Sequence, residues 1–274
     1  MRKQRIISIG ALLAVFFVSG AAGAHDLTEV LAAIANGDHR SAEHKARNKY
    51  RHPAETLVFF GIREHMTVAE ISPGGGGWYT EILAPFLRDK GTLYAGSYDP
   101  EAEEDYYRRN AKRFDQKLAA APEIYDHVIT TVFDPPHKLE AAPPASADLV
   151  LTFRNLHNWM EDGDAHAAMK GMYRITKPGG VLGLVQHRGA PSSRQDPAAE
   201  SGYIREDVVI ELAESVGFRY LASSEINANP KDGKDHPEGV WTLPPAFELE
   251  DVDRAKYSAI GESDRMTLKF VKPE

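Results

Sequence analysis

Hydrophobic and polar positions alternate along the chain in a way that predicts strands and helices in turn. Short apolar runs bounded by turn residues predict strands over residues 67–72, 92–97, 127–133, 148–153, 181–186, 218–226 and 266–271. Apolar residues at helical spacing predict helices over residues 78–88, 101–120, 165–175 and 206–216. This order predicts an α/β, Rossmann-like fold with a doubly wound, mostly parallel, seven-stranded sheet, whose ligands bind at the carboxyl ends of the strands.

Two further segments flank the predicted sheet. Residues 26–36 have one apolar helical face, and residues 57–60 form an apolar helical turn that ends at Gly61, so residues 25–66 are expected to form an N-terminal helical lid over residues 67–274. Residues 227–263, before the last strand, are rich in Pro, Asp and Lys. A connection of that length is more often a functional insertion than a plain loop.

The first 24 residues have the pattern of a cleavable signal peptide. Arg2, Lys3 and Arg5 precede an apolar run over residues 6–18, and small residues end at Ala24. The run is shorter than the roughly 20 residues that a membrane-spanning helix needs. We therefore expect a chain that begins at His25, is periplasmic or secreted, and has no membrane contact after cleavage.

Composition narrows the possible functions. The sequence has no cysteine, which excludes disulfides, Cys-ligated zinc and thiol nucleophiles. Its formal charge is −8, and loss of the three basic residues of the signal peptide makes it −11, which argues against nucleic acid or anionic lipid as a partner. The 11 histidines, even with Asp232, Asp235 and His236 close together, lack the spacing of a metal site. We expect a small-molecule ligand and no metal; the pattern does not indicate an oligomeric state.

Four consecutive glycines, Gly74 to Gly77, lie between the first predicted strand and helix. Glycines there expose backbone amides at the positive end of a helix, and Glu70 upstream suits a ligand with an ammonium group or hydroxyls, which together indicate adenosylmethionine. The dinucleotide spacing fails because Tyr79 or Thr80 stands at the third glycine. A hydrolase elbow fails because Ser72 is not between two glycines.

These elements resemble the class I S-adenosylmethionine-dependent methyltransferases. This resemblance is carried by the loop after Glu70, by Leu-Val-Leu-Thr-Phe-Arg-Asn-Leu-His157 and by Lys-Pro-Gly-Gly180. When Gly-Val-Trp-Thr-Leu-Pro-Pro245 is included, the chain looks more closely like a bacterial group of exported predicted methyltransferases. It implies that S-adenosyl-L-methionine is the cofactor. It also implies that the methionine end and the adenosine meet Glu70, Ser72, Gly74, Gly75, Gly76 and Gly77. Ser72 stands where relatives have the first glycine, and Pro73 follows it.

The resemblance also suggests residues for the nucleoside. In relatives an acid at the end of the second strand holds the ribose. Here Ser97 takes that position, so Asp99, two residues later, is the candidate. An equal alternative is that Asp99 is the N-cap of the next helix. Asp134 and Phe133 match positions that meet adenine, although Asp134-Pro-Pro is also typical of a turn.

Polar residues that follow the fourth strand are candidates for catalysis. His157 can act as a base near neutral pH, and Arg154 and Asn155 can orient an acceptor oxygen or an anionic substrate; helix capping and an ordinary salt bridge are the alternatives. We expect methyl transfer to a small-molecule acceptor. An exported ligand-binding or sensing protein, or another enzyme, on the same fold stays open.

Overall fold

A single seven-stranded sheet forms the centre of the protein. A computed structural model describes residues 20–274, and its strands lie in the order β3-β2-β1-β4-β5-β7-β6. Their bounds are β1 Thr67–Ile71, β2 Thr92–Ser97, β3 Val128–Val132, β4 Ala147–Phe153, β5 Thr176–His187, β6 Arg219–Ser224 and β7 Arg265–Val271. The first five strands pair in parallel, and β7 is antiparallel to β5 and β6. The predicted mostly parallel sheet, with the fourth strand at its centre, is confirmed.

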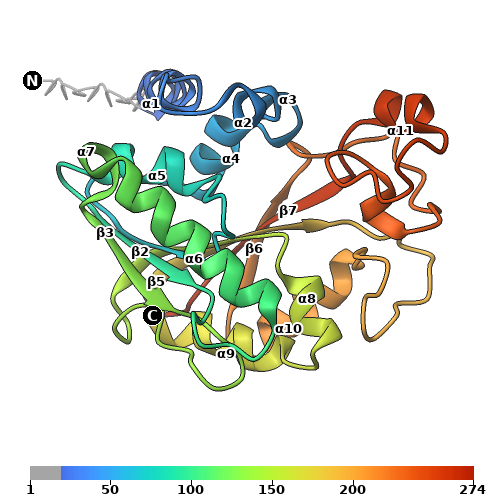
Figure 1. Cartoon of the computed structure of the whole chain (residues 1–274). Helices are drawn as coiled ribbons and strands as arrows, with labels where there is room; N and C mark the ends of the chain where they lie inside the picture. The colour runs from blue at the N-terminus through green and yellow to red at the C-terminus, as the bar shows by residue number, and fades with distance from the viewer. Residues whose placement is uncertain (1–19) are drawn as a thin grey trace, which may run out of the picture.

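Helices cover both faces of the sheet (Figure 1). In the N-terminal half they are α1 Gly20–Ala35, α2 Ala42–Ala46, α3 Asn48–Arg51, α4 Pro53–Phe60, α5 Thr80–Leu87, α6 Asp105–Ala120 and α7 Pro122–Tyr125. In the C-terminal half they are α8 Leu156–Glu161, α9 Ala165–Ile175, α10 Glu206–Ser215, the 3-10 helix η1 Gly239–Thr242 and α11 Arg254–Ile260.

The apolar core has two layers, one on each face of the sheet. Along β4, Leu149 and Leu151 pack with α1, α4 and α5, whereas Val150 between them packs with α9 and α10. Successive side chains of a strand point to opposite faces, so a strand covered on both sides is apolar throughout. This explains why β4 reads as a continuous apolar run.

Some element boundaries differ from those predicted. Helix α6 begins at Asp105 instead of residue 101, and α1 begins at Gly20 instead of residue 26. Strand β5 begins at Thr176 instead of residue 181, because the backbone of residues 177–180 bonds to residues near the end of the chain: Gly179 N donates to Lys272 O and Lys272 N to Gly180 O. Helices α7 and α8 were not predicted; each is too short to show a helical period.

The N-terminal helices lie along one side of the sheet, beside the segment that carries α11 (Figure 1). Glu81 of α5 holds them: its carboxylate accepts hydrogen bonds from Arg40 Nε and His44 Nδ1, each at 2.9 Å, and from Lys117. The predicted signal peptide, residues 1–24, lies mostly outside the described residues. In the part of the chain that the structure describes, no helix is long and apolar enough to cross a membrane.

Candidate functional site

Two cavities adjoin at the carboxyl ends of β1 and β4. The strand order reverses there, since the chain runs from β1 outward to β3 and then returns to β4 on the other side of β1. We call the cavity of about 480 Å³ on the β4, β5 and β7 side the arginine-lined cavity, and that of about 570 Å³ on the β2 and β3 side the aspartate-lined cavity. Their linings share four residues, Ser72, Tyr98, Asn155 and Asn158. A ligand that spans both cavities therefore passes the end of β1.

The four glycines after β1 serve two purposes. At Gly74 (φ +69°) an added Cβ would meet no atom within 4 Å, so bare backbone faces the arginine-lined cavity. At Gly77 (φ +51°) a Cβ would lie 2.9 Å from the Phe114 ring, so this glycine lets α6 approach. The N–H of Gly75 donates to Asn110 Oδ1 of α6 at 3.3 Å. Gly74, Gly76 and Gly77 line the cavity, and Gly75 and Gly77 pack against α6.

Ser72 has an unusual backbone and an unused hydroxyl. Its φ is +51°, a region that favours glycine. The side chain is 5% exposed, and its Oγ has no hydrogen-bond partner within residues 20–274. Because Ser72 lines both cavities, its hydroxyl is placed to bind a polar ligand group.

Glu70 lies in β1 and lines neither cavity. Its carboxylate accepts a hydrogen bond from Thr80 Oγ1 at 2.6 Å, which joins β1 to α5. Burial raises the pKa of Glu70 to about 7, although the hydrogen bonds with Thr80 lower it. A cation beside the carboxylate would lower the raised pKa of Glu70 and favour its charged form. A ligand with an ammonium group therefore fits this position chemically. Contact between Glu70 and a ligand stays a prediction.

The aspartate-lined cavity brings together the three residues predicted to meet the nucleoside, Asp99, Phe133 and Asp134. Asp99 Oδ1 accepts from the N–H of Glu101 at 3.1 Å, and Lys138 Nζ binds Oδ2. Helix α6 begins only at Asp105, so Asp99 is not its N-cap. Burial and the charge of Asp99 raise the pKa of Asp134. The buried Phe133 ring lies edge-on to Trp159, with ring centroids 5.8 Å apart.

Arg154 and Asn155 follow β4 and line the arginine-lined cavity. Asn155 Nδ2 donates to the carbonyls of Ile71 at 3.0 Å and Ser72 at 3.2 Å, which ties the end of β4 to the glycine loop. Its amide nitrogen thus positions the loop. Arg154 has a φ of +63°, and its guanidinium has no hydrogen-bond or ion-pair partner among the described residues.

His157 is buried beside the same cavity, and its neighbours fix its tautomer. Gln186 Nε2 lies 3.0 Å from Gly202 O, which can only accept, and 3.1 Å from His157 Nδ1. The Gln186 amide therefore donates to both atoms, and the neutral His157 ring carries its proton on Nε2. Burial, together with the charge of Arg154, lowers the pKa of His157 to about 4. At neutral pH His157 is a hydrogen-bond donor, and its predicted role as a base does not fit this geometry.

Comparison with known proteins relates this chain to methyltransferases in sequence and in fold. Residues 70–184 match a family model described as a methyltransferase domain. The fold is that of the class I methyltransferases. A SAM-dependent methyltransferase from Aquifex aeolicus has a similar structure, with 14% identity over 89% of this chain and 97% of its own and a TM-score of 0.54. No curated protein matches the sequence of the chain.

Two more solved structures show the same methyltransferase fold. One is a putative sarcosine dimethylglycine methyltransferase from Galdieria sulphuraria, with 12% identity over 86% of this chain and 88% of its own and a TM-score of 0.55. The other is phosphoethanolamine N-methyltransferase 2 from Haemonchus contortus in complex with S-adenosyl-L-methionine, with 15% identity over 92% of this chain, 57% of its own and a TM-score of 0.55. At these identities the likeness concerns the fold alone.

Several residues of the arginine-lined cavity come from outside the methyltransferase motifs. Arg47 and Arg51 enter from the N-terminal helices, and Arg265 from the start of β7. The long segment before β7 contributes Val240, Trp241 and residues 243–246, and the centroid of the Trp241 ring lies 5.7 Å from that of the His157 ring. Arg47 and Arg51 both belong to residues 25–66, which were predicted to form a lid. Arg265 had no sequence signal, because a single arginine beside a strand is common on protein surfaces.

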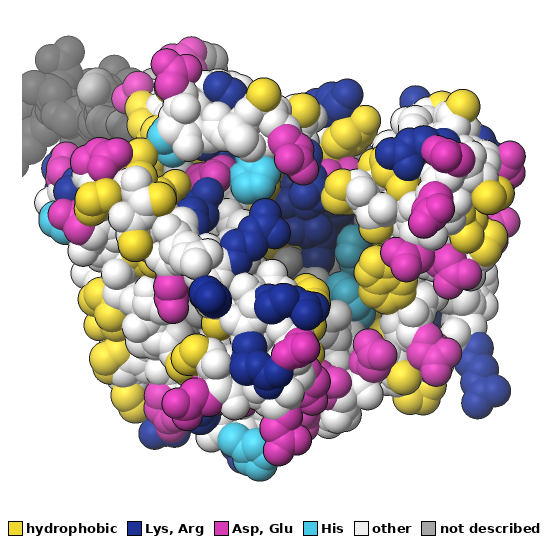
Figure 2. Space-filling view, in the orientation of Figure 1, with side chains coloured by type: hydrophobic (Ala, Val, Ile, Leu, Met, Phe, Trp, Pro, Cys, Tyr) yellow, Lys and Arg dark blue, Asp and Glu magenta, His cyan; other side chains and the backbone are white. Residues whose placement is uncertain are grey.

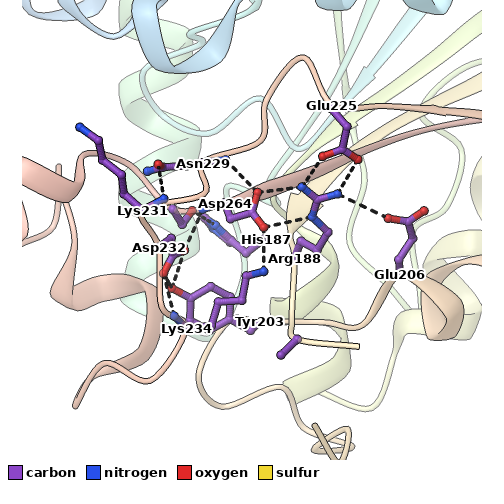
Figure 3. A network of polar contacts seen from close by, with 12 residues as sticks. His187, Arg188, Tyr203, Glu206, Glu225, Asn229, Lys231, Asp232, Lys234 and Asp264 are labelled. Carbon is purple, nitrogen blue, oxygen red and sulfur yellow. Dashed lines mark hydrogen bonds and ion pairs between the residues drawn. The ribbon is translucent and has the colours of Figure 1, made fainter. Parts of the chain in front are cut away.

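The cluster of Asp232, Asp235 and His236 serves a different purpose. Both Asp232 oxygens are engaged: they accept from Tyr203 Oη at 2.9 Å, Lys234 N at 2.9 Å and Asp264 N at 2.7 Å, and His236 lies within hydrogen-bonding distance (Figure 3). Asp232 thus fastens the long segment to the start of β7. Over residues 20–274 no group of three His, Asp or Glu side chains is placed to hold a metal ion.

Proposed function

We propose that the protein binds S-adenosyl-L-methionine across the two cavities and transfers its methyl group to a small molecule held in the arginine-lined cavity. The observation that carries this proposal is the meeting of both cavities at Ser72, beside the bare backbone of Gly74. The match of residues 70–184 to a methyltransferase domain supports it.

The residues present fit this cofactor. The aspartate-lined cavity offers Asp134 for an amine, the Phe133 ring for a base and Asp99 for ribose hydroxyls. The unused Ser72 hydroxyl and the exposed Gly74 backbone suit the methionine end. A bound adenosylmethionine would supply an electrophilic methyl group on its sulfonium.

The protein's own part in the reaction is to align the acceptor and to exclude water. The Arg154 guanidinium attracts and orients the methyl acceptor, and His157 donates a hydrogen bond to the acceptor from Nε2. Trp241 and residues 243–246 cover the cavity. With His157 neutral and its Nδ1 occupied, this site suits an acceptor atom that is already nucleophilic at neutral pH.

Titration of the purified protein with adenosylmethionine and adenosylhomocysteine by calorimetry tests the proposal. Binding of both ligands is expected, and no binding at millimolar ligand would contradict it. Gly74→Ala should weaken binding at least tenfold, because its methyl group enters the space above the loop. Gly163→Ala is the matched control: Gly163 also has a positive φ (+80°) and open space around its Cβ, but it lines neither cavity.

We also propose that residues 1–24 direct export and are removed. The buried residues of α1, Leu31 and Ala35, follow the predicted cleavage site, so cleavage leaves their packing intact. N-terminal sequencing of protein recovered from the periplasm should begin at His25. Recovery of the uncleaved chain from the cytoplasm would contradict this proposal.

A further inference from the structure

Three arginines converge on Glu262, two from the N-terminal helical segment and one from the start of β7. Arg47 Nε lies 2.6 Å from its Oε1, Arg51 Nε lies 3.1 Å from Oε2, and Arg265 Nη2 binds Oε2 as well. Arg154 lines the same cavity. We call Arg47, Arg51, Arg154 and Arg265 the arginine cluster. Figure 2 shows Lys, Arg and His side chains gathered in a hollow of the surface.

The cluster has a large excess of positive charge. Four guanidinium groups face one carboxylate, Glu262, which leaves three positive charges unbalanced in a protein whose formal charge is −8. Among the residues that line the cavity, the only carboxylate is the exposed Glu43. Burial lowers the pKa values of His157 and His187, so neither ring adds charge at neutral pH. The cavity is therefore suited to an anion.

Several donors of the cluster are buried and unused. Arg51 is 3% exposed and Arg265 is 2% exposed, yet Arg51 Nη2 and Arg265 Nε have no hydrogen-bond partner within the described range. The Arg154 guanidinium likewise has no partner there, and burial, followed by the charge of Arg265, lowers its pKa to about 10. Buried charged donors are costly when unpaired, and a bound oxyanion would satisfy them.

The cluster is held in place before any ligand binds. The Arg51 guanidinium lies over the Trp78 ring, 4.7 Å from its centroid. Asn229 Nδ2 donates to Glu262 O at 2.7 Å, and Asn229 N to Asp264 Oδ1 at 2.9 Å. Figure 3 shows Asp264 between Asn229 and Arg188, whose guanidinium binds both Asp264 oxygens. This network fixes the residues on both sides of Glu262.

We infer that the arginine cluster binds a doubly charged oxyanion group of the methyl acceptor, such as a phosphate monoester. This inference rests on the proposed function, because it names the class of acceptor. A single carboxylate would leave two of the three unbalanced charges, whereas a dianion leaves one. Guanidinium groups also match the geometry of oxyanions through paired N–H donors.

The position of the cluster favours the acceptor over the methionine carboxylate of the cofactor. Arg154 follows β4, and Arg265 begins β7, two strands further from β1. Both arginines are therefore on the β4, β5 and β7 side of β1. The aspartate-lined cavity, in which the nucleoside is proposed to bind, is on the β2 and β3 side. A cofactor carboxylate near the glycine loop would leave Arg265 Nε without a partner.

Calorimetry with inorganic phosphate, malonate and acetate at low ionic strength tests the inference. Phosphate should bind at least tenfold more tightly than the monoanion acetate, and malonate shows whether a dicarboxylate serves as well. Arg154→Gln should weaken phosphate binding at least tenfold, and its fold is expected to survive because Arg154 has no side-chain partner in the described chain. Arg174→Gln is the control: this arginine pairs with Glu140 at the surface, outside both cavities, and should bind phosphate unchanged.

Saturating adenosylhomocysteine distinguishes the two sources of the anion. An unchanged phosphate affinity supports the acceptor site, whereas competition would assign the cluster to the methionine carboxylate and overturn the inference. Equal binding of phosphate by Arg154→Gln and the unsubstituted protein would also overturn it. If phosphate binds through Arg154 but adenosylhomocysteine does not bind at all, the anion site stands and the proposed methyl transfer fails.

Discussion

Replacing Ser72 with glycine should stabilise the protein while weakening cofactor binding. Ser72 has a φ of +51°, and its buried Oγ has no partner within residues 20–274. Both features cost free energy in the unliganded protein. Relief of the backbone conformation contributes roughly 1–2 kcal/mol, from which the greater freedom of glycine in the unfolded chain removes about 0.4–1 kcal/mol.

The unpaired hydroxyl adds a second contribution. Leaving a buried polar group unsatisfied costs about 1–3 kcal/mol, so Ser72→Gly should raise the free energy of unfolding by about 2 kcal/mol in total. For a protein of this size that corresponds to a melting temperature about 4 °C higher or more. Loss of a hydrogen bond worth about 0.5–1.5 kcal/mol should at the same time weaken adenosylhomocysteine binding about 2- to 10-fold.

Urea denaturation and calorimetry with adenosylhomocysteine measure the two effects, and two further variants separate their causes. Ser72→Ala removes the hydroxyl but keeps the left-handed backbone. Ala145→Gly relieves a similar backbone conformation, φ +50°, at an exposed position away from both cavities. If Ser72→Gly lowers the free energy of unfolding, or leaves ligand affinity unchanged, the reasoning about this residue is wrong.

Two other predictions concern pH. Although burial raises it, hydrogen bonds from His44, Lys117 and Arg40 lower the pKa of Glu81 to about 2. The ionised Glu81 therefore stabilises the folded protein fully above about pH 5, and this stabilisation is lost as the pH falls towards 2. In urea denaturation, Glu81→Gln should lower the free energy of unfolding by about 2–3 kcal/mol at pH 7 and by much less at pH 3. An equal loss at both pH values would contradict this prediction. Because the pKa of His157 is lowered to about 4, its ring signals in NMR should not titrate between pH 5.5 and 8, and a midpoint near 6.5 would show that burial does not lower this pKa.

The predicted site residues were only partly brought together by the fold. Asp99, Phe133 and Asp134 line one cavity and Arg154, Asn155 and His157 the other, because each follows a parallel strand and those strands end at one edge. Glu70 lies in β1 near the same edge, but its carboxylate is bound by Thr80 and lines neither cavity. Strand position predicts which edge a residue reaches, whereas the direction of its side chain depends on packing.

The sequence by itself determined the order of strands and helices, the two-sided core and the edge of the sheet at which a ligand binds. Those features follow from hydrophobic periods of 2 and 3.6 residues and from glycines at one turn, which are local properties of the chain. Only the tertiary structure decided that Arg51, Arg154 and Arg265 line one cavity and that Arg51 and Arg265 pair with Glu262, since the three arginines are separated by up to 214 positions in the numbering, from Arg51 to Arg265. It also decided the tautomer of His157, which depends on Gln186 and Gly202. Such contacts depend on how the layers pack, and no local pattern in the sequence encodes them.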